Sequence, residues 1–365
     1  MSENSSHCET INVKFTHALL PPVFISVFVV GTLSNIWGLK SVCSSWKNIG
    51  NINIFMLNLG VADLLYLSTL PFLVSYYAGG SRWHFGQPFC KVTRFCFHLN
   101  LYGSIGFLTC ISVYRYLGIV HPMKVMGKIS SRHSVVMSAL VWILVIIQIL
   151  PDMFFDKNDE TSPDSCFDTT SNNLTRAYLP YSVSWAVTGF CLPLLINLLC
   201  YGHIVAVLAR KTTVNPLLKQ RCLKLVLILL LLFSVCFIPY HVFRNINLRT
   251  RILKQDGVCH SSFDSIYIAH QVGRCLACLN SAINPLIYIV GNDDFPLKLR
   301  HFSRRAYQSL SRFKGTWVIY RKPTEVGADH SAEICVNSEE SHSAGMCCGV
   351  PCATEPRTAQ ERVAT

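Results

Sequence analysis

Long apolar segments follow one another along the chain, with short polar connections between them. Seven of these segments approach or exceed the ~20 residues that an α-helix needs to cross a lipid bilayer. They lie near residues 18–44, 52–78, 87–120, 133–155, 177–210, 218–247 and 263–290. The pattern predicts an all-α membrane protein in which residues 18–290 form a seven-transmembrane-helix bundle.

The composition favours the same fold class. Of the 365 residues, 51% are hydrophobic and only 14% are charged, which is typical of a membrane protein rather than of two soluble domains. Proline occurs inside several spans, as at Pro71 and Pro193. In a membrane bundle the neighbouring helices can satisfy the backbone groups that proline leaves unpaired, so these residues do not contradict the prediction.

Basic residues set the predicted orientation. The formal net charge is +12, and Lys and Arg concentrate in the connections on one side of the spans and after residue 295. By the positive-inside rule this side is cytoplasmic, so we expect a multi-pass plasma-membrane protein whose residues 1–17 form an extracellular tail. This distribution accounts for the basic charge without a nucleic acid partner. Sequons at Asn4 and Asn173 then lie outside and are predicted glycosylation sites.

The segment after the last span has a different pattern. Residues 291–313 mix Phe, Leu and Tyr with many Arg and Lys, which predicts a short amphipathic helix in contact with the lipids of the inner leaflet. Residues 314–365 have weak apolar periodicity and are predicted to be a disordered cytoplasmic tail. Its serines beside acidic residues, Ser338, Ser341 and Ser343, are predicted phosphorylation sites.

Asp63 is an acidic residue in the middle of the second span. Ionisable groups within a bilayer are costly and normally face the bundle interior or a partner, so we expect polar side chains to converge on this carboxylate. The expected set is Asn35, Ser104, Asn280, Ser281 and Asn284. Oxygen ligands around a carboxylate suit a sodium ion, the only cofactor that the sequence indicates. A hydrogen-bonded network without an ion is the alternative.

Cationic and polar residues collect at the outer ends of three spans, opposite to what the positive-inside rule places there. Their spacing puts those of each span on one helix face. They are Arg94, His98 and Tyr102, then His241 and Arg244, then Gln271, Arg274 and Cys278. Three converging guanidinium groups suit the oxygens of phosphate groups, so the pattern predicts an anionic ligand.

Other charged residues near the outer ends have different predicted roles. Asp168 follows Cys166 by two residues and is expected to neutralise Arg274 when no ligand is bound. Arg249 and Arg251 are instead expected to extend toward the membrane surface, as isolated arginines near helix ends usually do.

A set of motifs distributed over the spans resembles the signature of the rhodopsin-like G-protein-coupled receptors. The motifs are Asn35, Leu59-Gly60-Val61-Ala62-Asp63, Tyr114-Arg115-Tyr116, Trp142, Pro193, Tyr201, Phe237-Ile238-Pro239 and Asn284-Pro285-Leu286-Ile287-Tyr288. The resemblance covers residues 18 to about 310. It implies that Arg115 contacts a heterotrimeric G protein in the active state. It also implies a switch formed by Tyr201, Phe237, Pro239, Asn284, Pro285 and Tyr288.

Two consequences follow from this resemblance. Tyr114 stands where the family usually has an acidic residue before the arginine, so an ion pair that restrains the inactive state is expected to be missing. Cys90 and Cys166 occupy the positions that the superfamily typically joins, and Cys8 and Cys259 would connect the tail to the third outer loop. Each disulfide is expected to add ~2–4 kcal/mol of stability.

Several outer segments resemble the metabotropic purinoceptors, most closely the adenine-nucleotide members. The segments are Cys90 to Phe95, Asn100 to Ser104, Cys166 to Thr170, His241 to Arg244 and Gln271 to Arg274. The resemblance implies a nucleotide pocket with arginines on the phosphates, lined by Arg94, His98, Tyr102, His241, Arg244, Gln271 and Arg274. Cys278 and Arg244 depart from the relatives, which commonly carry Ser and Lys there, so ADP, ATP and UTP all remain candidates.

The function implied is a receptor for extracellular nucleotides that activates the phospholipase C and calcium pathway. Arrestin and receptor kinases would be partners at the tail. A rhodopsin-like receptor for another anionic ligand, such as a lipid, a carboxylate or a peptide, is the main alternative. A transporter is a second, although the sequence has no inverted repeat. Neither an HExxH nor a GxSxG motif is present, so no enzyme is predicted.

Overall fold

The computed structural model describes residues 14–43, 51–122, 130–159, 162–210 and 216–285. Within this part of the chain, six helical spans are long and apolar enough to cross a membrane. They are Phe15–Cys43, Asn51–Ala78, Gln87–Val120, Ser131–Phe154, Thr175–Arg210 and Cys222–Gln255. The predicted helix at 291–313 and tail at 314–365 lie outside the described residues, as do Asn4, Cys8 and Tyr288.

Most spans consist of consecutive helical elements rather than one regular helix. The first and third are single helices, α1 (Lys14–Cys43) and α4 (Gln87–Val120). The second combines α2 (Asn51–Leu67) with α3 (Leu70–Ala78), and the fourth combines α6 (Ser131–Ile149) with the 3-10 turn η2 (Leu150–Phe154). The fifth and sixth each contain a π-helical segment: α7 (Thr175–Ala186), η3 (Val187–Cys191) and α8 (Leu192–Arg210), then α9 (Pro216–Leu232), η4 (Phe233–Phe237) and α10 (Ile238–Gln255).

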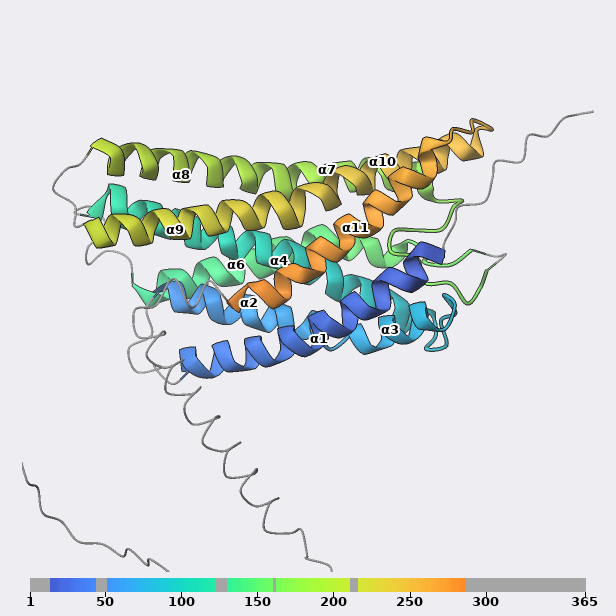
Figure 1. The fold of residues 1–365 in the computed structure, drawn as a ribbon, viewed down its shortest axis with the longest axis horizontal. Coiled ribbons are helices and arrows are strands. Elements are labelled where there is room, and N and C mark those ends of the chain that lie inside the picture. The colour runs from blue at the N-terminus through green and yellow to red at the C-terminus, as the bar shows by residue number, and fades with distance from the viewer. Residues whose placement is uncertain (1–13, 44–50, 123–129, 160–161, 211–215, 286–365) are drawn as a thin grey trace, which may run out of the picture. The chain divides into compact units, whose positions relative to one another are not determined.

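The seventh helix of the described bundle is α11 (Ser262–Ile283). It is less apolar than the other six because it carries polar side chains, among them Asp264, His270, Gln271 and Arg274. It packs along α10 on one side and α1 on the other (Figure 1). The membrane helix with the weakest apolar pattern therefore brings several buried polar groups into the bundle.

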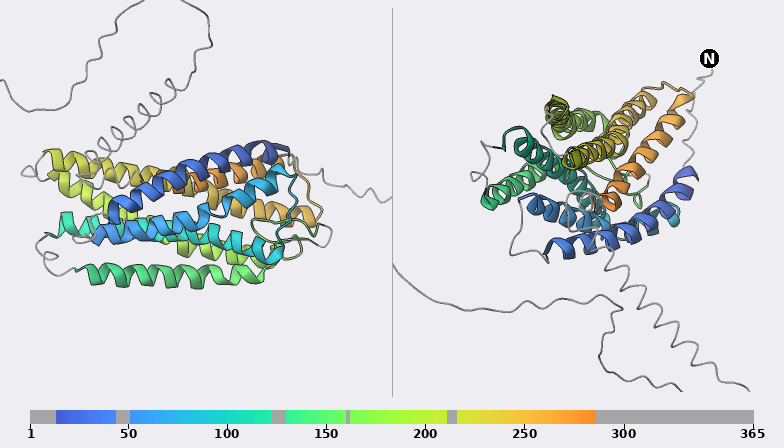
Figure 2. Two further views of the ribbon diagram at one scale, coloured as in Figure 1. Left: turned by 90° about the horizontal axis from the view of Figure 1, so that it is seen from below. Right: turned by 60° about the vertical axis from the view of Figure 1, so that its left-hand side comes forward.

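The third span lies at the centre of the helix packing. α4 packs against α2, α6 and α8, and Figure 2 shows the same neighbours in two further views. Its side chains Ile105, Phe107 and Ile111 are fully buried. Large apolar side chains on the outer faces, such as Leu144 and Leu199, are in contrast 64% and 65% exposed. These faces are suited to contact lipid chains.

Two prolines follow the two π-helical segments. Pro193 is the second residue of α8, after η3, and Pro239 is the second residue of α10, after η4. Proline lacks an N–H and its ring displaces the carbonyl of the preceding turn, which a wider π turn can accommodate. At Gly273 the backbone of α11 approaches the second bend, because an added Cβ would lie 3.0 Å from the carbonyl carbon of Pro239. The bend therefore packs closely against the seventh helix.

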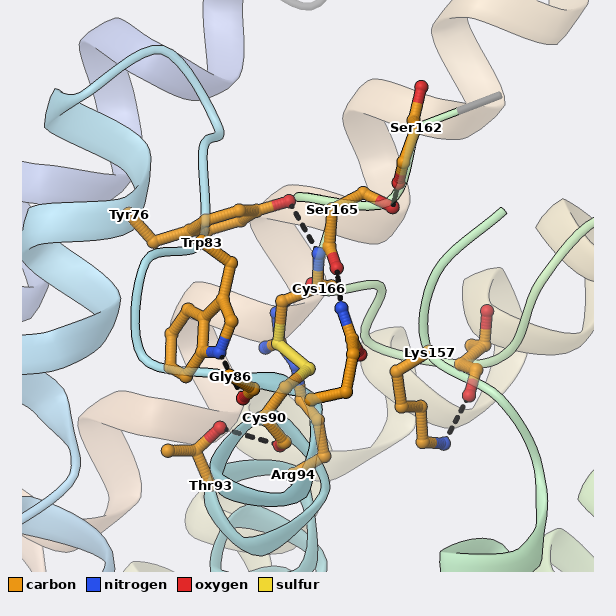
Figure 3. Close-up of a disulfide and its surroundings, with 12 residues drawn as sticks. Tyr76, Trp83, Gly86, Cys90, Thr93, Arg94, Lys157, Ser162, Ser165 and Cys166 are labelled. Carbon is orange, nitrogen blue, oxygen red and sulfur yellow. Dashed lines mark hydrogen bonds between the residues drawn. A yellow bond between two sulfur atoms is a disulfide. The ribbon is translucent and has the colours of Figure 1, made fainter. Parts of the chain in front are cut away.

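A disulfide joins the start of α4 to the second outer loop, as expected. Cys90 and Cys166 are 76 residues apart in sequence, and their Cα atoms are 5.8 Å apart (Figure 3). The backbone N–H of Cys166 donates to the hydroxyl of Tyr76, 3.2 Å away, and the backbone N–H of Trp83 donates to the carbonyl of Asp164 at 2.6 Å. The loop is thus fixed across the outer end of the bundle. The second disulfide, between Cys8 and Cys259, stays a prediction.

Candidate functional site

A cavity of about 960 Å³ opens at the outer end of the bundle, between the second outer loop and the outer turns of α10 and α11. Four of the side chains that line it are cationic and two are acidic. The cations are Arg82, Arg251, Lys254 and Arg274, and the acids are Asp164 and Asp168. The excess of positive charge makes this cavity suited to an anionic ligand.

Arg274 and Asp168 form an ion pair in this cavity. The guanidinium Nη1 lies 3.7 Å from Asp168 Oδ2, and Nε2 of His270 lies 3.3 Å from the same oxygen. Burial acts to raise the pKa of the Asp168 carboxyl, but the attraction of His270 and Arg274 outweighs it and holds the pKa well below its usual range. Asp168 is therefore ionised and positioned to neutralise Arg274, the arrangement that the sequence predicts.

Arg94 lies under the disulfide in the view of Figure 3, and its charge also acts on the Asp168 carboxylate. Its side chain is 2% exposed, and Nη2 donates to the carbonyl of Cys166 at 2.5 Å. Its Nε has no hydrogen-bond partner among the described residues, and neither do Nε and Nη2 of Arg274. Buried N–H groups normally have partners, so these free donors indicate where an acceptor-rich ligand would bind.

Arg244 lies outside the lining of the cavity. It is 1% exposed, and its Nη2 donates to the hydroxyl of Tyr178 at 2.7 Å. The guanidinium also lies over three aromatic rings, 5.4 Å from the ring centre of Trp185 and 5.7 Å from those of Tyr178 and Tyr240. These contacts favour a fixed position for a planar cation.

The remaining predicted pocket residues form a buried aromatic layer deeper along α4 and α10. The ring of Tyr102 lies 6.4 Å from that of His98 and 5.6 Å from that of His241, and His241 stacks on Phe190 at 4.4 Å. Nε2 of His98 and Nε2 of His241 have no hydrogen-bond partner among the described residues. Of the eight predicted ligand residues, the cavity lining contains Asp168, Gln271 and Arg274, whereas Arg94, His98, Tyr102, His241 and Arg244 lie behind it.

The expectation that Arg251 extends toward the membrane surface is wrong. α10 continues past the predicted end of its span at residue 247 to Gln255, which directs Arg251 toward the second outer loop. Its guanidinium donates to the Thr169 hydroxyl at 2.9 Å and to the Asn172 side chain at 2.7 Å. Arg249 is exposed on the same helix, as expected. Arg249 and Arg251 are two residues apart, which places them on different faces of α10. This spacing is the only sequence signal that distinguishes their surroundings.

Residues 34–288 match the family model described as the 7 transmembrane receptor, rhodopsin family. The chain belongs to this family. It is therefore a receptor rather than an enzyme, and a multi-pass protein of the plasma membrane, as the sequence predicts.

Known relatives indicate which branch of the rhodopsin family this receptor resembles. It is 39% identical over 305 residues to purinoceptor 1 of Homo sapiens, which covers 83% of this chain and 82% of the relative. The identity to purinoceptor 1 of Cavia porcellus is 40% over 301 residues, or 82% and 81% of the two chains. The 2-oxoglutarate receptor 1 of Rattus norvegicus is 37% identical over 290 residues, or 79% and 85%. The resemblance to the metabotropic purinoceptors is confirmed.

The receptor also has a polar cluster at Asp63, which contains Asn35, Ser281 and Asn284 of the predicted set and, in addition, Asn100. Asn284 Nδ2 donates to both carboxylate oxygens at 3.1 and 3.0 Å, and Asn100 Nδ2 donates to Oδ1 at 2.7 Å. Ser281 donates in turn to the Asn100 side chain at 2.9 Å, and Asn35 donates to the Ser281 carbonyl at 2.8 Å. Asn100 is not in the predicted set, because it is an uncharged residue and nothing in the sequence around it indicates a contact with Asp63.

A sodium ion at this cluster stays a prediction. The side chains of Ser104 and Asn280 are buried and have no hydrogen-bond partner among the described residues, so their oxygens fit as ligands of such an ion. The amide donors on Asp63 already offset part of its charge. Both the ion-bound and the ion-free network therefore fit these residues.

At the cytoplasmic half of the receptor, the described switch residues lie on four helices. The Tyr201 hydroxyl is hydrogen-bonded to the Ser112 hydroxyl, one turn before the half-buried Arg115 on α4. Phe237 is fully buried as the last residue of η4, next to the bend at Pro239. Asn284 and Pro285 are buried at the end of α11. Their roles in activation stay predictions.

The predicted glycosylation site Asn173 is among the described residues, and its side chain is exposed in the second outer loop.

Proposed function

We propose that this receptor responds to an extracellular small anion with two or more negative charges, with the adenine nucleotides ADP and ATP as the first candidates. We also propose that it activates a heterotrimeric G protein and the phospholipase C and calcium pathway. The observation that carries the proposal is the burial of three guanidinium groups at the outer ends of three helices. Arg94, Arg244 and Arg274 are each at most 3% exposed, and each has a side-chain N–H without a hydrogen-bond partner among the described residues.

Electrostatics supports a multiply charged ligand. Of the two acids in the lining, Asp168 pairs with Arg274, so the cavity has more cations than acids. Like charges repel strongly where water is excluded, and an anion that enters would relieve this repulsion. Phosphate and carboxylate oxygens match the planar fork of arginine. The cavity of about 960 Å³ is also large enough for a nucleotide.

The relatives support the nucleotide in particular. The human relative is named as a purinoceptor, and the similarity covers about four fifths of both chains. A second candidate is a dicarboxylate, because the 2-oxoglutarate receptor 1 is 37% identical. Two carboxylates at the ends of a short chain would contact two guanidinium groups in the same way as a diphosphate.

The proposed mechanism is a shift between two states of the bundle. A ligand that contacts Arg244 on α10 and Arg274 on α11 binds best when these helices approach each other at their outer ends, so it stabilises that state. The bend at Pro239 would then allow the cytoplasmic half of the sixth span to move outward. Arg115 would contact the G protein in that state, and arrestin and receptor kinases would act on the tail.

The first experiment measures intracellular calcium in cells that express the receptor. ADP, ATP, UTP, UDP and 2-oxoglutarate are applied separately, and untransfected cells are the control. A response to a nucleotide supports the first candidate, and a response to 2-oxoglutarate alone supports the second. Silence to all five with receptor at the cell surface, and with cyclic AMP unchanged, would reject both.

The site itself is tested by Arg274→Ala. We expect the potency of the active ligand to fall about 100-fold with surface expression kept, because a buried charge-assisted contact is lost. The matched control is Arg249→Ala, an exposed arginine on the neighbouring helix, which should change potency by less than about threefold. Equal potency of the Arg274 variant and the unmodified receptor would refute the site.

A further inference from the structure

A second buried carboxylate lies at the outer end of the fourth span. Asp152, in η2, is 1% exposed and accepts hydrogen bonds on Oδ1 from Lys157 Nζ at 2.8 Å and from the Tyr178 hydroxyl at 2.7 Å. Its Oδ2 lies 3.5 Å from Nδ1 of His98. Lys157 is itself fully buried and also donates to the carbonyl of Thr169 in the second outer loop. Asp152 and Lys157 thus form a buried ion pair.

Tyr178 connects this carboxylate to Arg244. Its hydroxyl accepts from Nη2 of Arg244 at 2.7 Å and donates its one proton to Asp152 at 2.7 Å. Both hydrogen bonds can therefore exist at the same time. The ring of Tyr178 is fully buried between the two cations, with Lys157 Nζ 5.4 Å and the Arg244 guanidinium carbon 5.7 Å from its centre. Asp152 therefore acts on Arg244 through one side chain.

The charges of this group do not cancel. Lys157 and Arg244 are positive and Asp152 is negative, which leaves one positive charge where water is excluded. Burial lowers the pKa of the Lys157 ammonium, and the carboxylate of Asp152 opposes this. Burying an unpaired charge is costly, so a protein seldom keeps such a group as packing alone. The network lies directly behind the cationic cavity, which suggests a role in ligand selection.

We propose that Asp152 is the internal counterion of Arg244 and a specificity-determining residue of the ligand site. Through Tyr178 it positions the guanidinium of Arg244. Through its own charge it limits how much negative charge the ligand can bring to the inner end of the site. This inference deepens the proposed function and rests on it for the ligand, whereas the hydrogen-bonded link itself does not.

The test compares the potencies of ADP and ATP, which differ by about one negative charge. In Asp152→Asn the inner group gains one net positive charge, so the ratio of potencies should shift toward ATP by about tenfold, the order expected for one charge several ångströms away. In the double variant Asp152→Asn with Lys157→Met the net charge returns to its original value, and the ratio should return with it. The matched control is Asp156→Asn, an acid whose side chain is 63% exposed and pairs with Lys91.

An unchanged ratio in Asp152→Asn, or an equal shift in Asp156→Asn, would overturn the proposal. A general loss of packing lowers both potencies together and leaves their ratio unchanged, so it too counts against the proposal. If Asp152→Asn fails to reach the cell surface, the double variant and the ligand-free measurement below decide.

The ligand-free measurement separates this inference from the proposed function. Melting temperatures of the purified receptor are compared for Tyr178→Phe, Arg244→Gln and the double variant. If the Tyr178 hydroxyl holds Arg244 in place, which the link to Asp152 requires, the double variant should lose clearly less than the sum of the two single losses. Additive losses would overturn the link, even if nucleotides activate the receptor. Coupled losses would support it even if neither ADP nor ATP is active.

Discussion

Single side chains in this receptor are positioned by contacts that depend on their exact chemistry. Arg244 combines a hydrogen bond to Tyr178 with stacking against Trp185 and Tyr240. A lysine could donate to Tyr178 but could not present a flat face to the rings. Arginine at position 244 therefore supplies a flat cation that a lysine there would not.

Arg251 gives a prediction at this scale. Arg251→Ala should lower ligand potency about ten- to thirtyfold, because the guanidinium both lines the cavity and donates to Thr169 and Asn172 of the second outer loop. Dose-response curves for calcium release measure the change, with surface expression checked in parallel. A potency no different from that of Arg249→Ala would show that Arg251 only covers the cavity.

The sequence predicts side chains well when they follow a helical period. The spacing of Arg94, His98 and Tyr102 places them on one face of α4, and all three are buried there. It fails for Asp152 and Lys157, because the fold of the second outer loop decides that they meet. Such a contact leaves no periodic signal in the chain.

At the scale of elements, the third span has the predicted bounds, whereas several others are longer or less regular than their apolar runs indicate. The sixth span ends at Gln255 rather than near residue 247, because its outer turns face a polar loop and cavity and need no apolar pattern. Proline marks the bends in the sequence, but nothing marks the π turns before Pro193 and Pro239. A π turn is wider than an α-helical turn, so it forms only where the neighbouring helix leaves space for it. At Pro239 this space exists because Gly273 of α11 has no side chain.

The bend in the sixth span should be required for signalling. In Pro239→Ala the backbone N–H is restored, so η4 can close into a regular helix and the cytoplasmic half should move less. We expect the maximal calcium response to fall at least twofold, while ligand affinity changes by less than about threefold. Pro22→Ala, at an exposed position in α1, is the control. A full maximal response would mean that the switch does not need the bend.

The disulfide of the second outer loop should be required for a stable receptor. Cys90→Ser and Cys166→Ser each remove a link that closes a long loop, which corresponds to ~2–4 kcal/mol. Surface expression, measured by labelling of intact cells, should fall strongly in each. The double variant should be no worse than either single one, because the same bond is lost. Cys191→Ser, at an exposed free cysteine, should have no effect, and a double variant much worse than both single ones would contradict the pairing.

At the scale of the whole molecule, the candidate ligand site and the predicted G-protein contact at Arg115 lie at opposite ends of one bundle. The fold class, the orientation and the family could all be derived from apolar runs, basic residues and short motifs, because these reflect the membrane itself. The balance between inactive and active states could not. That balance depends on small energy differences between two packings of the same helices.

Tyr114 provides a test of this balance. Tyr114→Asp places a carboxylate beside Arg115 on α4, which should restore the restraining ion pair of the family and stabilise the inactive state. Ligand-free accumulation of inositol phosphates should fall at least twofold. Tyr114→Phe is the control, since it adds no charge. A basal level that does not respond to the new carboxylate would show that this position does not restrain the receptor.

The distribution of cations in the cavity and directly behind it affects the timing of the signal. Arg82 is exposed near the entrance, while Arg94 and Arg274 are buried. Exposed charges attract a diffusing anion over several ångströms and are screened by salt, whereas buried contacts are screened little. Added salt should therefore slow the arrival of the ligand but leave its departure nearly unchanged. The exposed charges at the entrance would then determine whether a brief pulse of ligand is detected. The buried arginines would determine how long the response lasts.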